Sequence, residues 1–267
     1  MLNPELIVVF VLLGSFIGFM AGLLGVGGGG IMVPLLTAIF LYQGVPVENV
    51  VHLALGTSMA AMIVTTFSSF RAHNAKKAVL WPVVYRMAFG VILGTFLATF
   101  LAAILSSLYL AIFFALFMAF VAVQMFLDIK PKPSREIAGK LGLLSAGIGI
   151  GAVSALVSIG GGSLTVPYLS WHNVDLKKAI GTSAAMGLPI SIAGTFGYLL
   201  NGWAFTDLQN LQVGFVYAPA VVLISLVSFF TAPYGAKLAH SLPIAKLKKV
   251  FACVLILLSI KMLTSIV

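Results

Sequence analysis

Two glycine clusters carry the residues of this chain that are best suited to hold a small ligand. The first cluster is Gly27, Gly28, Gly29 and Gly30, and the second is Gly160, Gly161 and Gly162 followed by Ser163. Consecutive glycines lose much conformational entropy in a helix, so we expect a helix to stop at each cluster and a new one to start after it. The first N–H groups of a restarting helix are unpaired and carry partial positive charge. Two such ends facing each other would bind a small anion without an arginine side chain.

Pairs of hydroxyl residues recur at a matching place after each cluster. Thr57 and Ser58 lie in the segment LGTSMA, and Thr182 and Ser183 lie in the segment IGTSAA. A hydroxyl can donate a hydrogen bond to an anion, and it can also bond to a carbonyl one turn back in its own helix. We therefore place these four residues after the glycines as substrate ligands, with the local carbonyl bond as the alternative.

The glycine clusters belong to an internal repeat. The segment GFMAGLLGVGGGGIMVP ends at Pro34 and aligns with GAVSALVSIGGGSLTVP, which ends at Pro167. The Gly-Thr-Ser blocks follow in the same order in both halves, with a longer connection in the first half. Broken helices at equivalent places of a repeat are typical of secondary transporters with a site at the membrane midplane. Pro34 and Pro167, which follow the breaks, are the candidate hinges.

Composition indicates that these segments lie in a membrane. Hydrophobic residues make up 61% of the 267 residues, charged residues only 8%, and the mean hydropathy is +1.16. A soluble domain carries roughly a quarter charged residues, so this chain has too few polar side chains to cover a water-facing surface. Runs such as 108–127 are apolar on every side and too long for the strands of a membrane barrel. The chain is therefore predicted to be an all-α integral membrane protein.

Hydropathy and charge together predict the number of crossings. Short segments at 31–43 and 163–171 follow the glycine clusters, and eight longer spans are expected at 6–26, 50–70, 80–99, 108–127, 141–159, 178–200, 210–230 and 247–266. Lys and Arg in short loops stay cytoplasmic. The fourteen loop cations fall on one side only if each short segment reverses the direction of the chain. We therefore predict eight long transmembrane helices and two short ones.

This count divides the chain into two membrane repeats, 1–128 and 141–267, joined by a basic cytoplasmic linker at 129–140. Each repeat has five segments, so the second enters the membrane in the opposite sense and the repeats are inverted. Both termini are predicted to lie outside, on the periplasmic side of the inner (plasma) membrane. The net charge of +9 reflects this loop topology rather than nucleic-acid binding. The expected partners are the lipid bilayer and a small anion, and the sequence leaves the oligomeric state open.

Other chemistry fits the residues less well. The segment 25–30 matches the dinucleotide pattern GxGxxG, but it follows a predicted transmembrane helix rather than a strand, and it lacks the Gly-Lys-Ser/Thr of a phosphate loop. Gly14, Gly18 and Gly22 recur every fourth residue, which predicts close helix packing. No cluster of His, Asp, Glu or Cys falls at membrane depth, so we expect no metal, no cofactor and no catalysis. An anion channel is the near alternative and a membrane-embedded enzyme the distant one.

The duplicated block Gly-Gly-Gly-x-Leu/Ile-x-Val-Pro, followed by Gly-Thr-Ser, resembles the sulfite exporter TauE/SafE family of small membrane proteins. The resemblance extends over essentially the whole chain. It implies transport of small anions, chiefly sulfur oxyanions and organosulfonates, usually outward from the cytoplasm. A carboxylate or even a cation is the alternative substrate, because the ends of short helices can bind either sign of charge. Gly30 stands where the second half has Ser163, so the two halves are not expected to contact substrate equally. The expected mechanism is alternating access, with one half rocking against the other.

Overall fold

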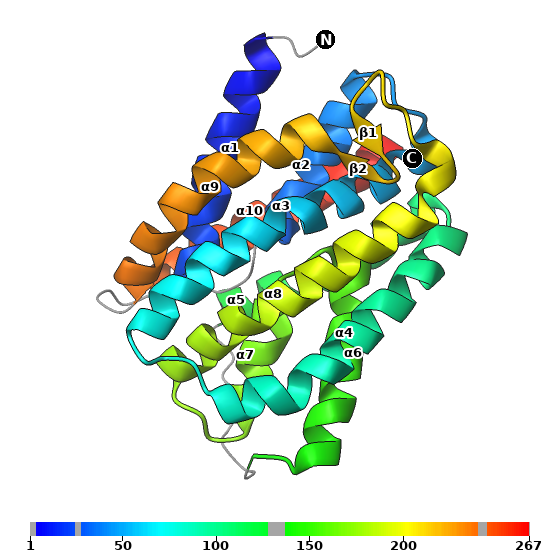
Figure 1. Cartoon of the computed structure of the whole chain (residues 1–267). Coiled ribbons are helices and arrows are strands. Elements are labelled where there is room, and N and C mark those ends of the chain that lie inside the picture. The colour runs from blue at the N-terminus through cyan, green and yellow to red at the C-terminus, as the bar shows by residue number, and fades with distance from the viewer. Residues whose placement is uncertain (1–3, 25–27, 128–136, 240–244, 267) are drawn as a thin grey trace.

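The protein is almost entirely helical. The computed structural model describes residues 4–24, 28–127, 137–239 and 245–266 (Figure 1). The helices of the first half are α1 (Pro4–Leu24), α2 (Gly29–Tyr42), α3 (Val47–Ala75), α4 (Trp81–Ile104) and α5 (Ser107–Phe126). Those of the second half are α6 (Lys140–Val157), α7 (Gly162–Trp171), α8 (Leu176–Asn201), α9 (Ala218–Ala239) and α10 (Ala245–Ile266). Short elements η1 (Trp203–Phe205), β1 (Gln212–Val213) and β2 (Val216–Tyr217) lie between α8 and α9.

Eight of these helices are long and apolar enough to cross a membrane, which confirms the predicted class. The other two, α2 and α7, have 14 and 10 residues. At 1.5 Å per residue they are about 21 Å and about 15 Å long, well short of the roughly 30 Å hydrocarbon core. Each is therefore too short to cross the hydrocarbon core as a single straight helix.

The seventh predicted span, 210–230, was wrong in its bounds because α9 runs from Ala218 to Ala239. The apolar residues before it form a β-hairpin, in which Gln212 pairs with Tyr217. Asp207 stabilises the turn before this hairpin, because its carboxylate accepts hydrogen bonds from the backbone N–H groups of Gln209 and Asn210. Hydropathy counts apolar side chains, whereas these backbone bonds decide where the helix begins.

The two halves are interleaved. The first helix of each half packs along the fourth helix of the other, so α1 lies along α9 and α6 lies along α4 (Figure 1). Helices α3 and α8 pack against each other, and each also packs on the fourth helix of the other half. Helix α5 packs against α10. The halves are therefore not separate bodies, because the closest helix pairs each combine one helix from either half.

Glycines allow these helix pairs to touch at the backbone. A Cβ on Gly14 would lie 2.8 Å from the carbonyl oxygen of Ile224, and Gly18 and Gly22 meet the α9 backbone in the same way. This confirms the predicted packing role. In the other pair, a Cβ on Gly147 would lie 2.6 Å from the carbonyl oxygen of Met87. Since Gly147 aligns with Gly14 in the repeat, the two crossings have the same construction.

Candidate substrate site

Both predicted helix breaks are present. Helix α1 ends at Leu24 and α2 starts at Gly29, while α6 ends at Val157 and α7 starts at Gly162. Gly28 and Gly161, the residues directly before the new helices, have φ angles of +86° and +82°. Side chains strongly disfavour this left-handed conformation, which explains a glycine at each position. Gly27 lies outside the described residues.

The two breaks meet each other. Gly29 contacts the carbonyl oxygen of Ser158 so closely that a Cβ atom would overlap it. Ser158 is the residue directly after the last residue of α6, with a φ of 50°. Its hydroxyl donates a 2.8 Å hydrogen bond to the hydroxyl of Ser58 on α3. The start of α2, the end of α6 and α3 are therefore joined at one point.

The two breaks also contact α3 and α8, the two longest helices, near the middle of each helix. The Cβ position of Gly29 is 3.3 Å from the Met62 sulfur of α3, and the carbonyl oxygen of Gly160 is 3.0 Å from the Cβ position of Gly187 on α8. Met62 and Gly187 are equivalent residues, each five positions after the threonine of the Gly-Thr-Ser block. One turn further on, the hydroxyls of the equivalent residues Thr66 and Ser191 lie 3.5 Å apart. These contacts support a site near the middle of the membrane.

Each restarting helix begins with N–H groups that make no backbone hydrogen bond to a described residue. In α2 the first bonded N–H groups are those of Ile31 and Met32, which reach the carbonyl of Gly28. In α7 they are those of Leu164 and Thr165, which reach the carbonyl of Gly161. The N–H groups just before them have no backbone acceptor within the described residues; they belong to Gly29, Gly30, Gly162 and Ser163. Four N–H groups at two helix N-termini are the kind of donor that binds small anions, and their contact with substrate stays a prediction.

Three buried hydroxyls near the second break add to these donors. The hydroxyl oxygens of Ser163 and Thr165 have no hydrogen-bond partner among the described residues, and neither does that of Ser154 in the last turn of α6. Thr165 and Ser154 are fully buried, and Ser163 is 9% exposed. A buried polar group without a partner costs about 1–3 kcal/mol. A ligand that accepts hydrogen bonds from these hydroxyls would recover that cost.

The first break lacks these hydroxyls. The residues that align with Ser163 and Thr165 are Gly30 and Met32. The Cβ position of Gly30 lies 3.1 Å from a Leu255 methyl carbon and 3.2 Å from the Met118 sulfur. The residues next to the second break thus carry hydroxyls, whereas the start of α2 lies against apolar side chains. Unequal contact of the two halves with substrate stays a prediction.

Pro34 and Pro167 both lie inside the first two turns of the short helices. A proline has no N–H group, so the carbonyl four residues earlier loses its helical partner. Those carbonyls belong to Gly30 and Ser163, which puts acceptors beside the donors of each break. The role of the two prolines as hinges stays a prediction.

Thr57 and Thr182 have partners within the protein. Thr57 accepts a 2.9 Å hydrogen bond from the Tyr217 N–H just before α9, and Thr182 accepts one of 2.9 Å from the Leu80 N–H just before α4. The two threonines thus hold the starts of equivalent helices in the opposite halves. Their predicted contact with substrate is untested, and the structure gives them this second role.

Replacing either threonine by valine removes that acceptor while keeping the side-chain shape. We expect Thr57→Val and Thr182→Val each to lower the free energy of unfolding by about 1 kcal/mol, since each leaves an N–H unpaired. Thermal unfolding of the purified protein in detergent measures this. Thr264→Val is the control, because its exposed hydroxyl bonds only to its own helix. Equal melting temperatures for all three variants would contradict the assignment.

Ser183 makes the hydrogen bond to a carbonyl of its own helix that was the alternative to substrate binding for the hydroxyl pairs. Its hydroxyl donates to the Ile180 carbonyl at 2.8 Å, within its own helix. Ser58 differs because it accepts from Ser158 at the second break. Sequence reasoning missed Ser154 and Ser158, although the two serines are four residues apart, just before the second glycine cluster, and this spacing places residues on the same side of a helix. Within the described residues, no group of three or more His, Cys, Asp or Glu side chains is arranged to hold a metal ion.

Known proteins similar to this chain are transporters by name. A probable membrane transporter protein of Haemophilus influenzae is 34% identical over 257 residues, covering 96% of this chain and 97% of that protein. A probable membrane transporter protein of Methanocaldococcus jannaschii is 25% identical over 267 residues, covering 98% and 96%. The probable membrane transporter protein YjnA of Bacillus subtilis is 24% identical over 235 residues, covering 82% and 89%. No solved structure matches this chain significantly.

Eight helices long enough to cross a membrane, two short helices that follow the breaks, and these relatives together define a multi-pass membrane transporter. The sequence profile of the sulfite exporter TauE/SafE family matches residues 10–262. The chain belongs to that family, and the resemblance drawn from the duplicated glycine block is confirmed.

Proposed function

We propose that this protein is a secondary transporter that moves a small sulfur oxyanion or organosulfonate, such as sulfite, across the inner membrane. The observation that carries the proposal is the direct contact of the two breaks, where Gly29 of α2 touches the Ser158 carbonyl at the end of α6. The N-termini of α2 and α7, one from each half, would supply N–H donors to a bound anion. The family name supports sulfur chemistry.

The donors around the second break suit a tetrahedral or pyramidal oxyanion. An oxyanion accepts several hydrogen bonds, and the N–H groups of Gly162 and Ser163 together with the hydroxyls of Ser163 and Thr165 offer four. The apolar side made by Met118 and Leu255 suits a small organic substituent on the anion. A carboxylate would use the same donors with one oxygen fewer.

Alternating access needs parts that move against each other. The interleaved packing favours α1 with α9 as one unit and α4 with α6 as the other, because glycines lock each pair backbone to backbone. Rocking one sequence half against the other, as the sequence suggested, would break both of these contacts. We therefore propose motion between the two mixed pairs, with α2 and α7 repositioned between them. The second half entering the membrane inverted, with both termini periplasmic, is part of the same proposal.

Counterflow in proteoliposomes tests the proposal. Vesicles loaded with unlabelled sulfite should take up labelled sulfite transiently above equilibrium, because a carrier exchanges substrate site by site. The same uptake should be inhibited by sulfoacetate and unaffected by chloride. A conductance that rises linearly with sulfite concentration, without counterflow, would replace the transporter by the anion channel. Absence of sulfite and sulfonate uptake, with carboxylate counterflow present, would replace the substrate class.

A further inference from the structure

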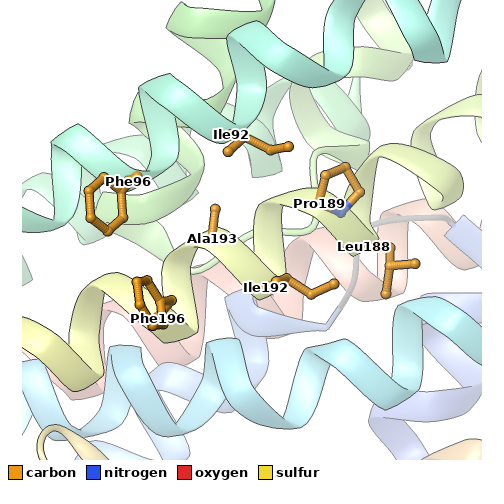
Figure 2. A pocket seen from close by; sticks show the side chains of 7 residues that line it. All are labelled: Ile92, Phe96, Leu188, Pro189, Ile192, Ala193 and Phe196. Carbon is orange, nitrogen blue, oxygen red and sulfur yellow. The ribbon is translucent and has the colours of Figure 1, made fainter.

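A groove on the outer face of the helix bundle lies apart from the substrate site. It has a volume of about 410 Å³ and runs between α4 and α8. Figure 2 shows its lining, which is wholly apolar and consists of Ile92, Phe96, Leu188, Pro189, Ile192, Ala193 and Phe196. Ile92 is 44% exposed, Ile192 50% and Phe196 56%, so the groove opens sideways from the bundle. An apolar hollow facing outward at this depth is suited to a hydrocarbon chain.

The end of the groove nearest the starts of α4 and α8 is basic. These starts lie side by side, since the Leu80 N–H donates to Thr182 and the Ala78 carbonyl oxygen contacts Gly181. Several exposed cations lie just before these two helix starts or in the first turns after them: Lys76, Lys77, Arg86, Lys177 and Lys178. The nearby carboxylate, Asp175, accepts hydrogen bonds from the backbone N–H groups that begin α8. The cations therefore outnumber the negative charge at this rim.

The rim and the groove are aligned along both helices. On α8, Lys178 precedes Pro189 by eleven residues, and on α4, Tyr85 precedes Phe96 by eleven. Eleven residues make about three helical turns, so the two residues of each pair lie on the same face of their helix. Eleven residues span about 17 Å, close to the roughly 15 Å of half a hydrocarbon core. Tyr85 is 71% exposed and stacks on Trp81. Such aromatic residues mark the membrane–water boundary.

We propose that this surface binds an anionic phospholipid, with one acyl chain in the groove and the phosphate on Lys178 and Arg86. A zwitterionic lipid would fill the groove equally well but would gain less at the rim, because its headgroup carries no net charge. The surface also differs from its counterpart in the other half. There, Ser68 takes the place of Ala193, and its hydroxyl donates a 2.6 Å hydrogen bond to the Phe229 carbonyl, which ties α3 to α9.

The proposed lipid groove lies next to the second helix break. Helix α8 lines the groove with Pro189 and touches the second break with Gly187 and Ile190, so the two sites share one stretch of helix. Bound lipid would support this stretch, and we expect it to raise the thermal stability of the transporter.

Native mass spectrometry of the full-length protein tests the proposal. The protein is released from detergent micelles containing equal amounts of dioleoyl phosphatidylglycerol and dioleoyl phosphatidylcholine. Wild type should retain phosphatidylglycerol preferentially, and Arg86→Gln with Lys178→Gln should weaken that preference about fivefold per charge removed. Ala193→Phe, which fills the groove, should abolish retention. Leu226→Phe, on the exposed face of α9, should behave as wild type.

Ile92→Trp fills the same groove from α4 and keeps the test decisive if Ala193→Phe does not fold. Equal retention of the two lipids by wild type would overturn the proposal, as would undiminished phosphatidylglycerol binding by the folded groove variants. Dimers that disappear in Ile92→Trp, without any lipid preference, would assign the groove to a second copy of the chain instead.

Discussion

Gly29→Ala is expected to lower sulfite transport by roughly a hundredfold, the scale of a misplaced binding group. A Cβ on Gly29 would overlap the Ser158 carbonyl oxygen, which is backbone and has no free rotation. The start of α2 must then move away from the end of α6, and the donors of the two breaks no longer converge. Uptake of labelled sulfite into proteoliposomes measures the effect.

Gly149→Ala is the matched control for this substitution. Gly149 also lies in a membrane helix, α6, but nothing is found within 4 Å of its Cβ position. Alanine there should leave transport unchanged and raise helix stability by up to about 1 kcal/mol. Loss of transport in both variants would show only that α-helical glycines are sensitive to substitution. Full transport by Gly29→Ala would contradict the account of the paired breaks.

Thr165→Val is expected to separate stability from function. The Thr165 hydroxyl is fully buried and has no partner among the described residues, so removing it should raise the free energy of unfolding by about 1 kcal/mol. The same change removes a donor to the anion, and hydrogen bonds to charged groups contribute about 1.5–3 kcal/mol. The affinity for sulfite should therefore fall roughly ten- to a hundredfold. Thermal unfolding and equilibrium binding of labelled sulfite measure the two effects.

Thr95→Val provides the comparison. Thr95 is equally buried, but its hydroxyl donates to the Gly151 carbonyl at 3.1 Å and joins α4 to α6. Valine there should lower stability by about 1 kcal/mol and leave sulfite affinity intact. If Thr165→Val instead destabilised the protein and bound sulfite normally, its hydroxyl would have a structural partner and no role in the site.

Much of the fold could be predicted because its signals are local. Glycine clusters end helices wherever they occur, so the breaks before Gly29 and Gly162 follow from composition. Apolar runs of about 20 residues give the long helices. The seventh span was misplaced because residues 210–217 are apolar enough to pass as membrane but lie in a turn and a hairpin that follow Asp207.

The contacts between elements could not be predicted in the same way. The roles of Thr57 and Thr182 depend on N–H groups at the starts of helices more than a hundred residues away, and nothing near the threonines in the chain indicates those partners. The interleaving of the halves is likewise a long-range result. The spacing of Gly14, Gly18 and Gly22 predicted close packing of the first helix but did not indicate that its partner is α9.

Equilibrium binding of labelled sulfite to the purified protein, measured for wild type beside Gly161→Leu, tests the central claim most directly. Gly161 has a φ of +82° and lies against Ile190, so leucine both strains the backbone and crowds the second break. The account predicts saturable binding by wild type and its loss in a Gly161→Leu protein that remains folded. Saturable binding of unchanged affinity in that variant would place the anion elsewhere and contradict the paired-break site.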